Sequence, residues 1–163
     1  MAESAYQAAL KILSRRDYFV AELRKRLVRK EFDADEIDDA IRRCVGFGLL
    51  DDQRVARRFI ELRAVSRGWG PHRLEAELRH RGVDDGLATV TARLEPSDLG
   101  GALDTALRRA EIRAHDTWWR LSDRRARMIS SLIARGFEAS DAIDAVERLA
   151  AARENPHNAL DDQ

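Results

Sequence analysis

The stretch AVSRGWGPHRLEAELRHRGVDD, residues 64–85, decides the fold. It gathers four corner-forming residues in a chain that has only nine glycines and three prolines: Gly68, Trp69, Gly70 and Pro71. Glycine permits backbone angles closed to other residues, and proline suits the first position of a helix because it has no N–H to lose. We therefore predict a tight corner between two helices, the second of which ends at Gly82.

The composition of the whole chain is that of a helical protein. Of its 163 residues, 44% are hydrophobic and 36% are charged, and only ten are aromatic. Leucine, alanine, arginine and the two acidic residues dominate, which is typical of helices and unlike sheets. The composition predicts an all-α fold.

The pattern of the quoted stretch recurs twice more. LRKRLVRKEFDADEIDDAI from Leu23, LEAELRHRGVDDGLATVTA from Leu74 and MISSLIARGFEASDAIDAV from Met128 begin 51 and then 54 positions apart. In each, two apolar residues lie four apart, and a third apolar residue follows five positions later: Leu23, Leu27 and Phe32; Leu74, Leu78 and Val83; Met128, Leu132 and Phe137. This frame predicts a helix, a turn and a residue that docks on the helix.

The turn itself has a glycine in two of the three segments. Gly82 and Gly136 precede the docking residue, as a left-handed helix C-terminus requires, whereas the first segment has Glu31 there. Either Glu31 adopts that conformation at a cost on the order of 1 kcal/mol, or the helix of the first segment ends differently. After the turn, Asp33 with Glu36 and, in the second segment, Asp84 predict the N-cap of a further helix.

Apolar spacing predicts two more helices in each segment. The buried stripes expected in the downstream helices are Ile37, Ile41 and Cys44; Leu87, Val90 and Leu94; and Ala142, Val146 and Leu149. Those expected upstream are Tyr6, Leu10 and Leu13; Val55, Phe59 and Leu62 after the cap region Asp51 and Asp52; and Leu103 and Leu107. Spacings of three and four mark one face of a helix.

We therefore predict an elongated, curved array of three tandem three-helix repeats. The repeats cover residues 1–47, 48–95 and 96–153, and a flexible tail follows over 154–163. A unit of about fifty residues has little core of its own, so neighbouring repeats should bury apolar faces against one another.

The middle repeat closely resembles the signature of the RecX family, bacterial regulatory proteins that modulate the RecA recombinase. The residues that carry the resemblance are Gly48, Leu49, Leu50, Asp51, Asp52, Ala56, Phe59, Arg63, Gly68, Gly70, Pro71, Arg73, Leu74, Glu77, Leu78 and Gly82. The resemblance extends into the first repeat and, more weakly, into RMISSLIARGF. Two positions depart from the family pattern: Phe19 replaces a serine that caps the second helix, and Glu31 replaces a glycine.

The resemblance implies a protein that binds in the groove of the RecA nucleoprotein filament. It implies inhibition of the filament's ATPase, coprotease and strand-exchange activities without any reaction of its own. It also implies the fold of three tandem three-helix units. An elongated array suits the role, because one molecule could contact successive RecA subunits and favour one filament state.

Charge is sorted along the chain although the formal net charge is zero. Residues 15–30 carry seven basic and two acidic side chains, residues 31–41 carry six acidic and no basic ones, and residues 54–81 carry eight basic and three acidic ones. The candidate contacts for RecA or DNA are the basic residues expected on exposed helix faces: Lys25, Arg26, Arg29, Arg54, Arg57, Arg58, Arg73, Arg79 and His80. The alternative is a solvated face that pairs with the acidic helix from Asp33.

Aromatic residues allow two interpretations. Trp69 aligns with Tyr18 of the first repeat, which favours a residue that seals the junction between two helices over an exposed anchor for a partner. Trp118 and Trp119 are adjacent and cannot both face one core, so we expect one of them to be exposed or at a repeat boundary.

Catalytic, metal and cofactor sites lack support in the sequence. The four histidines are scattered, no Cys/His ligand set is present, and no glycine-rich phosphate loop follows a strand. The single cysteine, Cys44, is expected in the core, which fits a reducing cytoplasm. No apolar run of membrane or signal-peptide length is present. We expect a cytoplasmic, monomeric protein that is no enzyme.

Three functions remain open from the sequence. The first is regulation of the RecA filament by direct binding. The second is a DNA-binding helical-repeat protein, which the basic segments favour and the acidic segments oppose. The third is a structural adaptor for another partner, which only the repeat architecture supports.

Overall fold

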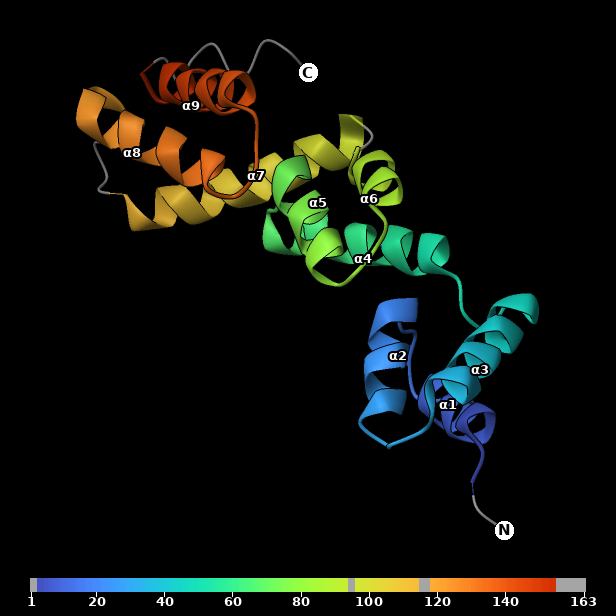
Figure 1. Cartoon of the computed structure of the whole chain (residues 1–163). Coiled ribbons are helices and arrows are strands. Elements are labelled where there is room, and N and C mark those ends of the chain that lie inside the picture. The colour runs from blue at the N-terminus through green and yellow to red at the C-terminus, as the bar shows by residue number, and fades with distance from the viewer. Residues whose placement is uncertain (1–2, 94–95, 115–117, 155–163) are drawn as a thin grey trace. The chain divides into compact units, whose positions relative to one another are not determined.

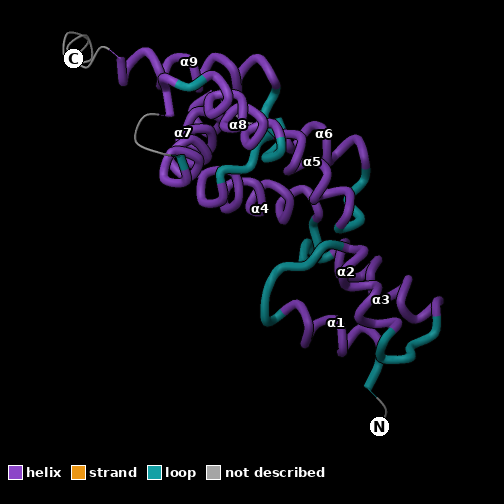
Figure 2. The backbone as a smooth tube through the Cα atoms, turned by 90° about the vertical axis from the view of Figure 1, so that its left-hand side faces the viewer, coloured by secondary structure: helices purple, strands orange, loops and turns teal. Residues whose placement is uncertain are grey.

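The computed structural model describes residues 3–93, 96–114 and 118–154, and these residues form helices joined by short turns (Figures 1 and 2). No strand occurs in the described residues. The elements in chain order are α1 (Ala5–Leu13), α2 (Val20–Val28), α3 (Ala34–Gly46), α4 (Asp52–Arg67), α5 (Pro71–His80), α6 (Asp85–Ala92), α7 (Pro96–Arg113), the 3-10 turn η1 (Trp118–Arg120), α8 (Ser122–Ile133) and α9 (Ala139–Glu154). The predicted all-α class is confirmed.

The chain divides into two units, and the boundaries between them fall inside α4, inside α5 and before the last residue of α6. The first unit holds the residues up to Ile60 together with Glu75–Thr91, and the second holds Glu61–Leu74 together with the residues from Ala92 onward. The predicted repeat boundaries remain a proposal. Of the predicted tail over 154–163, Glu154 ends α9 and the rest lies outside the described residues.

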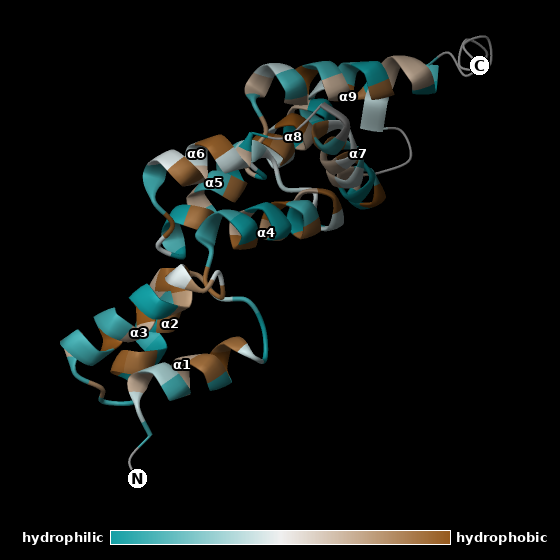
Figure 3. Cartoon of the chain, turned by 90° about the vertical axis from the view of Figure 1, so that its right-hand side faces the viewer, coloured by the Kyte–Doolittle hydropathy of each residue, from teal (hydrophilic) through white to brown (hydrophobic). Residues whose placement is uncertain are grey.

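In the first unit, α1, α2 and α3 pack on one another around a single hydrophobic cluster. Leu23 and Leu27 are fully buried there, and Cys44 is buried as predicted. Burial raises the pKa of the Cys44 thiol, which keeps it protonated. Figure 3 shows why these helices pack: each carries a hydrophobic face and a hydrophilic one. The predicted leucine pairs are confirmed in all three segments, since Leu74, Leu78, Met128 and Leu132 are buried as well.

Three predicted apolar stripes, those of α4, α6 and α1, are wrong in part. In α4 the buried side chains are Ala56, Ile60 and Ala64, whereas the predicted Leu62 is 61% exposed and Val55 and Phe59 are half-buried. The physical reason is that small alanines allow close helix packing, so they line the buried face and the larger residues lie beside it.

In two other helices, too, alanines are buried where larger apolar residues were predicted. In α6 Ala88 and Ala92 are buried and Val90 is exposed, while Leu94 lies outside the described residues. In α1 the buried residues are Ala5, Ala8 and Ala9, and Leu10 is exposed, whereas the predicted Tyr6 and Leu13 are partly buried and pack against the core. The stripes of α7 and α9 are confirmed by buried Leu103, Leu107, Ala142 and Val146, with Leu149 half-buried.

The turns after the leucine pairs all have a left-handed backbone, as predicted for Gly82 and Gly136. Gly82 has a φ of 85° and Gly136 a φ of 89°, and Glu31 has a φ of 63° although it carries a side chain. Among the described residues Glu31 is the one non-glycine with a positive φ. The helix that carries the first leucine pair therefore ends in the same backbone conformation as the other two, at a cost of about 1 kcal/mol.

The predicted N-caps are present. The backbone N–H groups of Gly86 and Leu87 donate to Asp84 Oδ1 at 2.9 and 3.3 Å at the start of α6. The N–H of Asp33 donates to Glu36 Oε2 at 3.4 Å at the start of α3, as in a capping box. These contacts fix where the third helix of each of the first two segments begins.

Candidate functional site

The GWGP corner, residues 68–71, is a turn against which another part of the second unit packs. Gly68 has a φ of 61°, and Pro71 begins α5 as predicted. The N–H of Gly70 donates to the carbonyl oxygen of Arg135 at 2.8 Å, and the N–H of His72 donates to that of Gly136 at 3.1 Å. The corner therefore hydrogen-bonds through its backbone to the turn between α8 and α9.

Three glycines permit this close packing. A Cβ added at Gly70 would lie 2.6 Å from the N of Phe137, and one added at Gly68 would lie 2.8 Å from the N of Ala106. Gly82 plays the same part in the first unit, where a Cβ would meet the Cβ of Ala21 at 2.5 Å. These three glycines therefore let neighbouring segments approach more closely than any residue with a Cβ would allow.

Trp69 lies half-buried at the corner, and the guanidinium of Arg73 stacks over its ring at 4.6 Å. This contact agrees with the interpretation of Trp69 as a residue that seals a helix junction. Of the adjacent tryptophans, Trp118 is buried and Trp119 is partly exposed, as expected of neighbours that cannot share one core.

The nine predicted contact residues are all exposed. Eight belong to the first unit and Arg73 belongs to the second. Their side chains fall into two groups according to what they touch within the described part of the chain. Five make a hydrogen bond, an ion pair or a ring contact, and four make none: Lys25, Arg29, Arg57 and His80.

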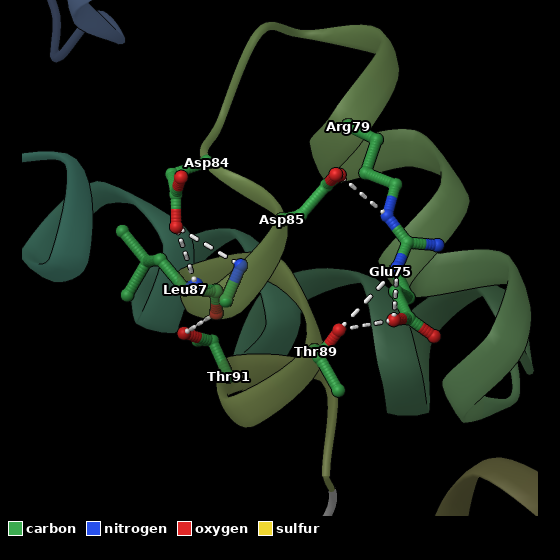
Figure 4. Close-up of polar contacts among 8 residues, drawn as sticks. Glu75, Arg79, Asp84, Asp85, Leu87, Thr89 and Thr91 are labelled. Atoms are coloured by element: carbon green, nitrogen blue, oxygen red, sulfur yellow. Dashed lines mark hydrogen bonds and ion pairs between the residues drawn. The ribbon is translucent and has the colours of Figure 1, made fainter.

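Arg79 is the most constrained of the first group, as Figure 4 shows. Its guanidinium reaches from α5 to α6, where Nε donates to Asp85 Oδ1 at 2.9 Å. Its Nη2 donates to Glu75 Oε1 at 2.7 Å and to Thr89 Oγ1 at 3.3 Å. Arg79 therefore holds two helices of its own unit together, and its charge is largely neutralised locally.

The other partnered residues make single contacts. Arg58 pairs with Asp17 at 3.1 Å, and Arg54 donates to the carbonyl oxygen of Gly48 at 3.1 Å. Arg26 lies over the ring of Tyr18 at 4.9 Å. The alternative of pairing with the acidic helix holds for one neighbour, because Arg24 pairs with Asp38 at 2.6 Å.

Arg81 is a structural residue that the sequence did not single out. It is half-buried, pairs with Glu22 at 3.0 Å and Glu77 at 3.1 Å, and stacks over Phe59 at 4.8 Å. It therefore links α5 with α2 and α4 inside the first unit. Its position directly before Gly82, at the end of a helix, was the only signal available.

Asp52 supplies the cap that Phe19 cannot give. Phe19 precedes α2 and is buried, and it offers no side-chain hydrogen bond to the helix. Instead the backbone N–H of Val20 donates to Asp52 Oδ1 at 2.8 Å, across 32 residues of sequence. Phe19, which departs from the family pattern, therefore packs in the core. The carboxylate of Asp52 in α4 accepts the hydrogen bond from the first N–H of α2 in place of a capping side chain.

We predict that Asp52→Ala destabilises the protein by about 1 to 2 kcal/mol, because the part-buried Val20 N–H loses its acceptor. Asp52→Asn keeps an acceptor oxygen and should cost less than half as much. Urea denaturation followed by circular dichroism measures both. Equal losses for the two variants would contradict the capping role.

The same variants predict a pH dependence. Burial raises the pKa of Asp52 above its ordinary value of 3.8, with the charges of Asp51 and Glu22 adding to the rise and the Val20 hydrogen bond opposing it. A raised folded-state pKa means that the fold favours the protonated acid. The free energy of unfolding of the wild type minus that of Asp52→Asn should therefore fall as pH rises from below 3.8 through the folded-state pKa.

Other site chemistry is not indicated by the described residues. Within the three described ranges no group of three His, Cys, Asp or Glu side chains could hold a metal ion. No helix in that part of the chain is long and apolar enough to cross a membrane.

Comparison with known proteins gives the family. Residues 5–44 match the family model described as "RecX, first three-helix domain", and residues 51–89 match "RecX, second three-helix domain". A "Regulatory protein RecX" of Trichlorobacter lovleyi is 39% identical over 108 residues, which are 66% of this chain and 70% of that protein. The chain belongs to the RecX family. The resemblance found in the sequence is therefore confirmed.

Further RecX relatives match over shorter segments. The "Regulatory protein RecX" of Syntrophotalea carbinolica is 46% identical over 85 residues, which are 52% of this chain and only 55% of that protein. The crystal structure of RecX from Lactobacillus salivarius superposes with a TM-score of 0.76 at 22% identity and covers 90% of this chain and 94% of that one. A second RecX crystal structure gives a TM-score of 0.74 at 17% identity, over 88% of this chain and 70% of that one. The two superpositions establish the RecX fold.

Proposed function

We propose that this RecX family member binds the RecA nucleoprotein filament and modulates, mainly by inhibition, its ATPase, coprotease and strand-exchange activities. The observation that carries the proposal is the set of exposed basic residues whose side chains have no partner among the described residues: Lys25, Arg29, Arg57 and His80. Charges that no neighbour neutralises are available to acidic side chains of a protein partner. Membership in a family of regulatory proteins supports the same function.

The proposed mechanism is differential binding, and the protein catalyses no reaction and needs no cofactor. A ligand shifts a filament between states only by binding one state better than the other. Three tandem three-helix repeats in an elongated, curved array would let one monomer contact successive RecA subunits in the cytoplasm. The family models matched over residues 5–44 and 51–89 support the first two of those repeats.

The test is the ATPase activity of the cognate RecA on single-stranded DNA. We expect the wild-type protein to slow hydrolysis at equal or lower molar amounts. The double variant Lys25→Glu/Arg57→Glu should raise the concentration for half-inhibition about tenfold, because two attractive contacts become repulsive. Neither residue has a partner in the described chain, so helical content should stay unchanged.

A matched control reverses the same number of charges elsewhere. Arg42 and Arg148 are exposed, and each makes one local contact, to Asp39 Oδ1 at 3.3 Å and to the carbonyl oxygen of Asp144 at 3.2 Å. Arg42→Glu/Arg148→Glu should inhibit like the wild type. Absence of inhibition by the wild type would refute the function, and full inhibition by the first variant would move the contact surface elsewhere.

Direct DNA binding is the second candidate, favoured by the same unpaired basic residues and opposed by the exposed acidic residues of α3. A salt titration without RecA separates the two functions. Tight duplex binding that weakens steeply with salt would favour the second, because phosphate contacts release counterions.

A further inference from the structure

A basic pocket in the first unit brings Arg26 and Arg29, two of the predicted contact residues, together with basic residues that the proposed function does not use. It encloses about 480 Å³ between α1, the segment before α2, and α2. Five cations and one carboxylate line it: Lys11, Arg15, Arg26, Arg29, Lys30 and Glu3. Ala8 and Ile12 of α1 add an apolar wall. All of these residues lie within one unit of the chain.

The cations of this pocket are incompletely neutralised. The guanidinium groups of Arg15 and Arg29 have no ion pair among the described residues. Arg26 lies on the buried Tyr18 ring at 4.9 Å, and Arg16 lies on the same ring at 4.1 Å. The ring is therefore buried and already contacted by two guanidinium groups, which leaves little of it for stacking on a ligand. The lining of the pocket favours a negatively charged group over an aromatic base.

Glu3 acts as an internal anion in the pocket. Its carboxylate lies 2.8 Å from the Lys11 ammonium and 3.8 Å from that of Lys30. The hydrogen bond from Lys11, assisted by the charges of Lys11 and Lys30, lowers the pKa of Glu3. Both lysines are exposed, so these pairs are weak, and a ligand of higher charge can replace the carboxylate.

We propose that this pocket binds a phosphomonoester or polyphosphate group in competition with Glu3. A phosphate monoester carries about two negative charges at neutral pH and accepts several hydrogen bonds, whereas a carboxylate carries one charge. Arginine forks suit bidentate binding of phosphate. The volume exceeds that of one phosphate ion and falls in the range of ligand pockets, which favours a chain of two or three phosphates.

The inference goes beyond RecA regulation, and its test contains no RecA. Inorganic pyrophosphate is titrated into the full chain by isothermal calorimetry at low salt. We expect saturable binding with one site, about fivefold tighter in Glu3→Gln because the internal competitor is neutral. Arg15→Glu and Lys30→Glu should each weaken binding at least tenfold.

Lys25→Glu is the matched control, because Lys25 lies on the same helix as Arg26 but does not line the pocket. It should change the affinity less than twofold. Circular dichroism checks that each variant is folded. An equal loss in Lys25→Glu and Lys30→Glu would reduce the site to a general basic surface and overturn the proposal, as would no saturable binding by either the wild type or Glu3→Gln.

Two further arms identify the source of the phosphate. Three competitors are each added before the pyrophosphate titration: ATP, an oligo(dT) that carries a 5′-phosphate, and the same oligonucleotide without that phosphate. Competition by ATP identifies a nucleotide polyphosphate, and competition only by the 5′-phosphorylated strand identifies a nucleic-acid end. Equal competition by both strands identifies internal phosphodiesters and overturns the preference for a monoester.

Discussion

Replacing Gly136 with alanine is expected to destabilise the protein by about 4 kcal/mol. A Cβ at this position would meet the backbone of Arg73, whose Cα would lie 3.0 Å away and whose N would lie closer still. Backbone atoms cannot rotate aside as the end of a side chain can. The φ of 89° adds strain for any residue with a Cβ.

The loss extends to the hydrogen bonds that this approach permits. The N–H of Gly70 donates to Arg135, and that of His72 donates to Gly136. Moving the turn away from the corner would leave both donors without these acceptors, and the loss costs about 1 to 3 kcal/mol for a donor that stays buried, as at Gly70. The measurement is equilibrium urea unfolding followed by circular dichroism and by tryptophan fluorescence, since all three tryptophans lie in the second unit.

Gly100 provides the control for this prediction. It lies inside α7, and a Cβ added there would have no atom within 4 Å. Gly100→Ala should therefore stabilise the protein by about 0.5 to 1 kcal/mol, because alanine is the better helix former. A loss below 1 kcal/mol for Gly136→Ala would show that the corner and the turn are not packed as described.

The frame of a leucine pair and a docking residue was predictable because it rests on local rules. The leucine pairs recur with the docking residue at a fixed distance, and burial of Leu23, Leu74 and Leu132 follows from that spacing. The left-handed turn was predictable from Gly82 and Gly136, and the same frame places Glu31 in that conformation despite its cost. Equivalent positions of this frame adopt the same backbone conformation even where one residue fits it poorly.

The contacts between distant segments were not predictable in the same way. The sequence predicts Asp52 at the start of its own helix, and only the fold brings its carboxylate to the N–H of Val20. Gly70 reads as a corner residue, and only the fold shows that it makes room for Phe137. The role predicted from the sequence was correct for both residues. Each has a second role as well, which depends on contact with a distant segment that local sequence rules cannot predict.

For the candidate site, exposure was predictable and charge availability was not. Helix periodicity placed Lys25 and Arg79 on the surface, and both are exposed. Arg79 is nevertheless bound by Glu75, Asp85 and Thr89, whereas Lys25 has no partner in the described chain. Which arginine remains free depends on the neighbouring helix, so a list of exposed basic residues overestimates the available charge.

The register of α4 gives the second large effect, because sequence and structure disagree there. Ile60 is 6% exposed and Leu62 is 61% exposed, although the sequence pattern placed Leu62 in the core. Ile60→Ala should destabilise the protein by about 3 kcal/mol, since it removes buried apolar volume and leaves a cavity.

Leu62→Ala removes a side chain of similar size from the same helix, and it should change the free energy of unfolding by less than about 0.5 kcal/mol. Both variants keep a good helix former, so helix propensity cannot produce the difference. Urea unfolding of the two variants under identical conditions measures it. If Leu62→Ala were the more damaging change, α4 would be rotated from the register described, and the buried face would be the one that Val55, Phe59 and Leu62 predicted.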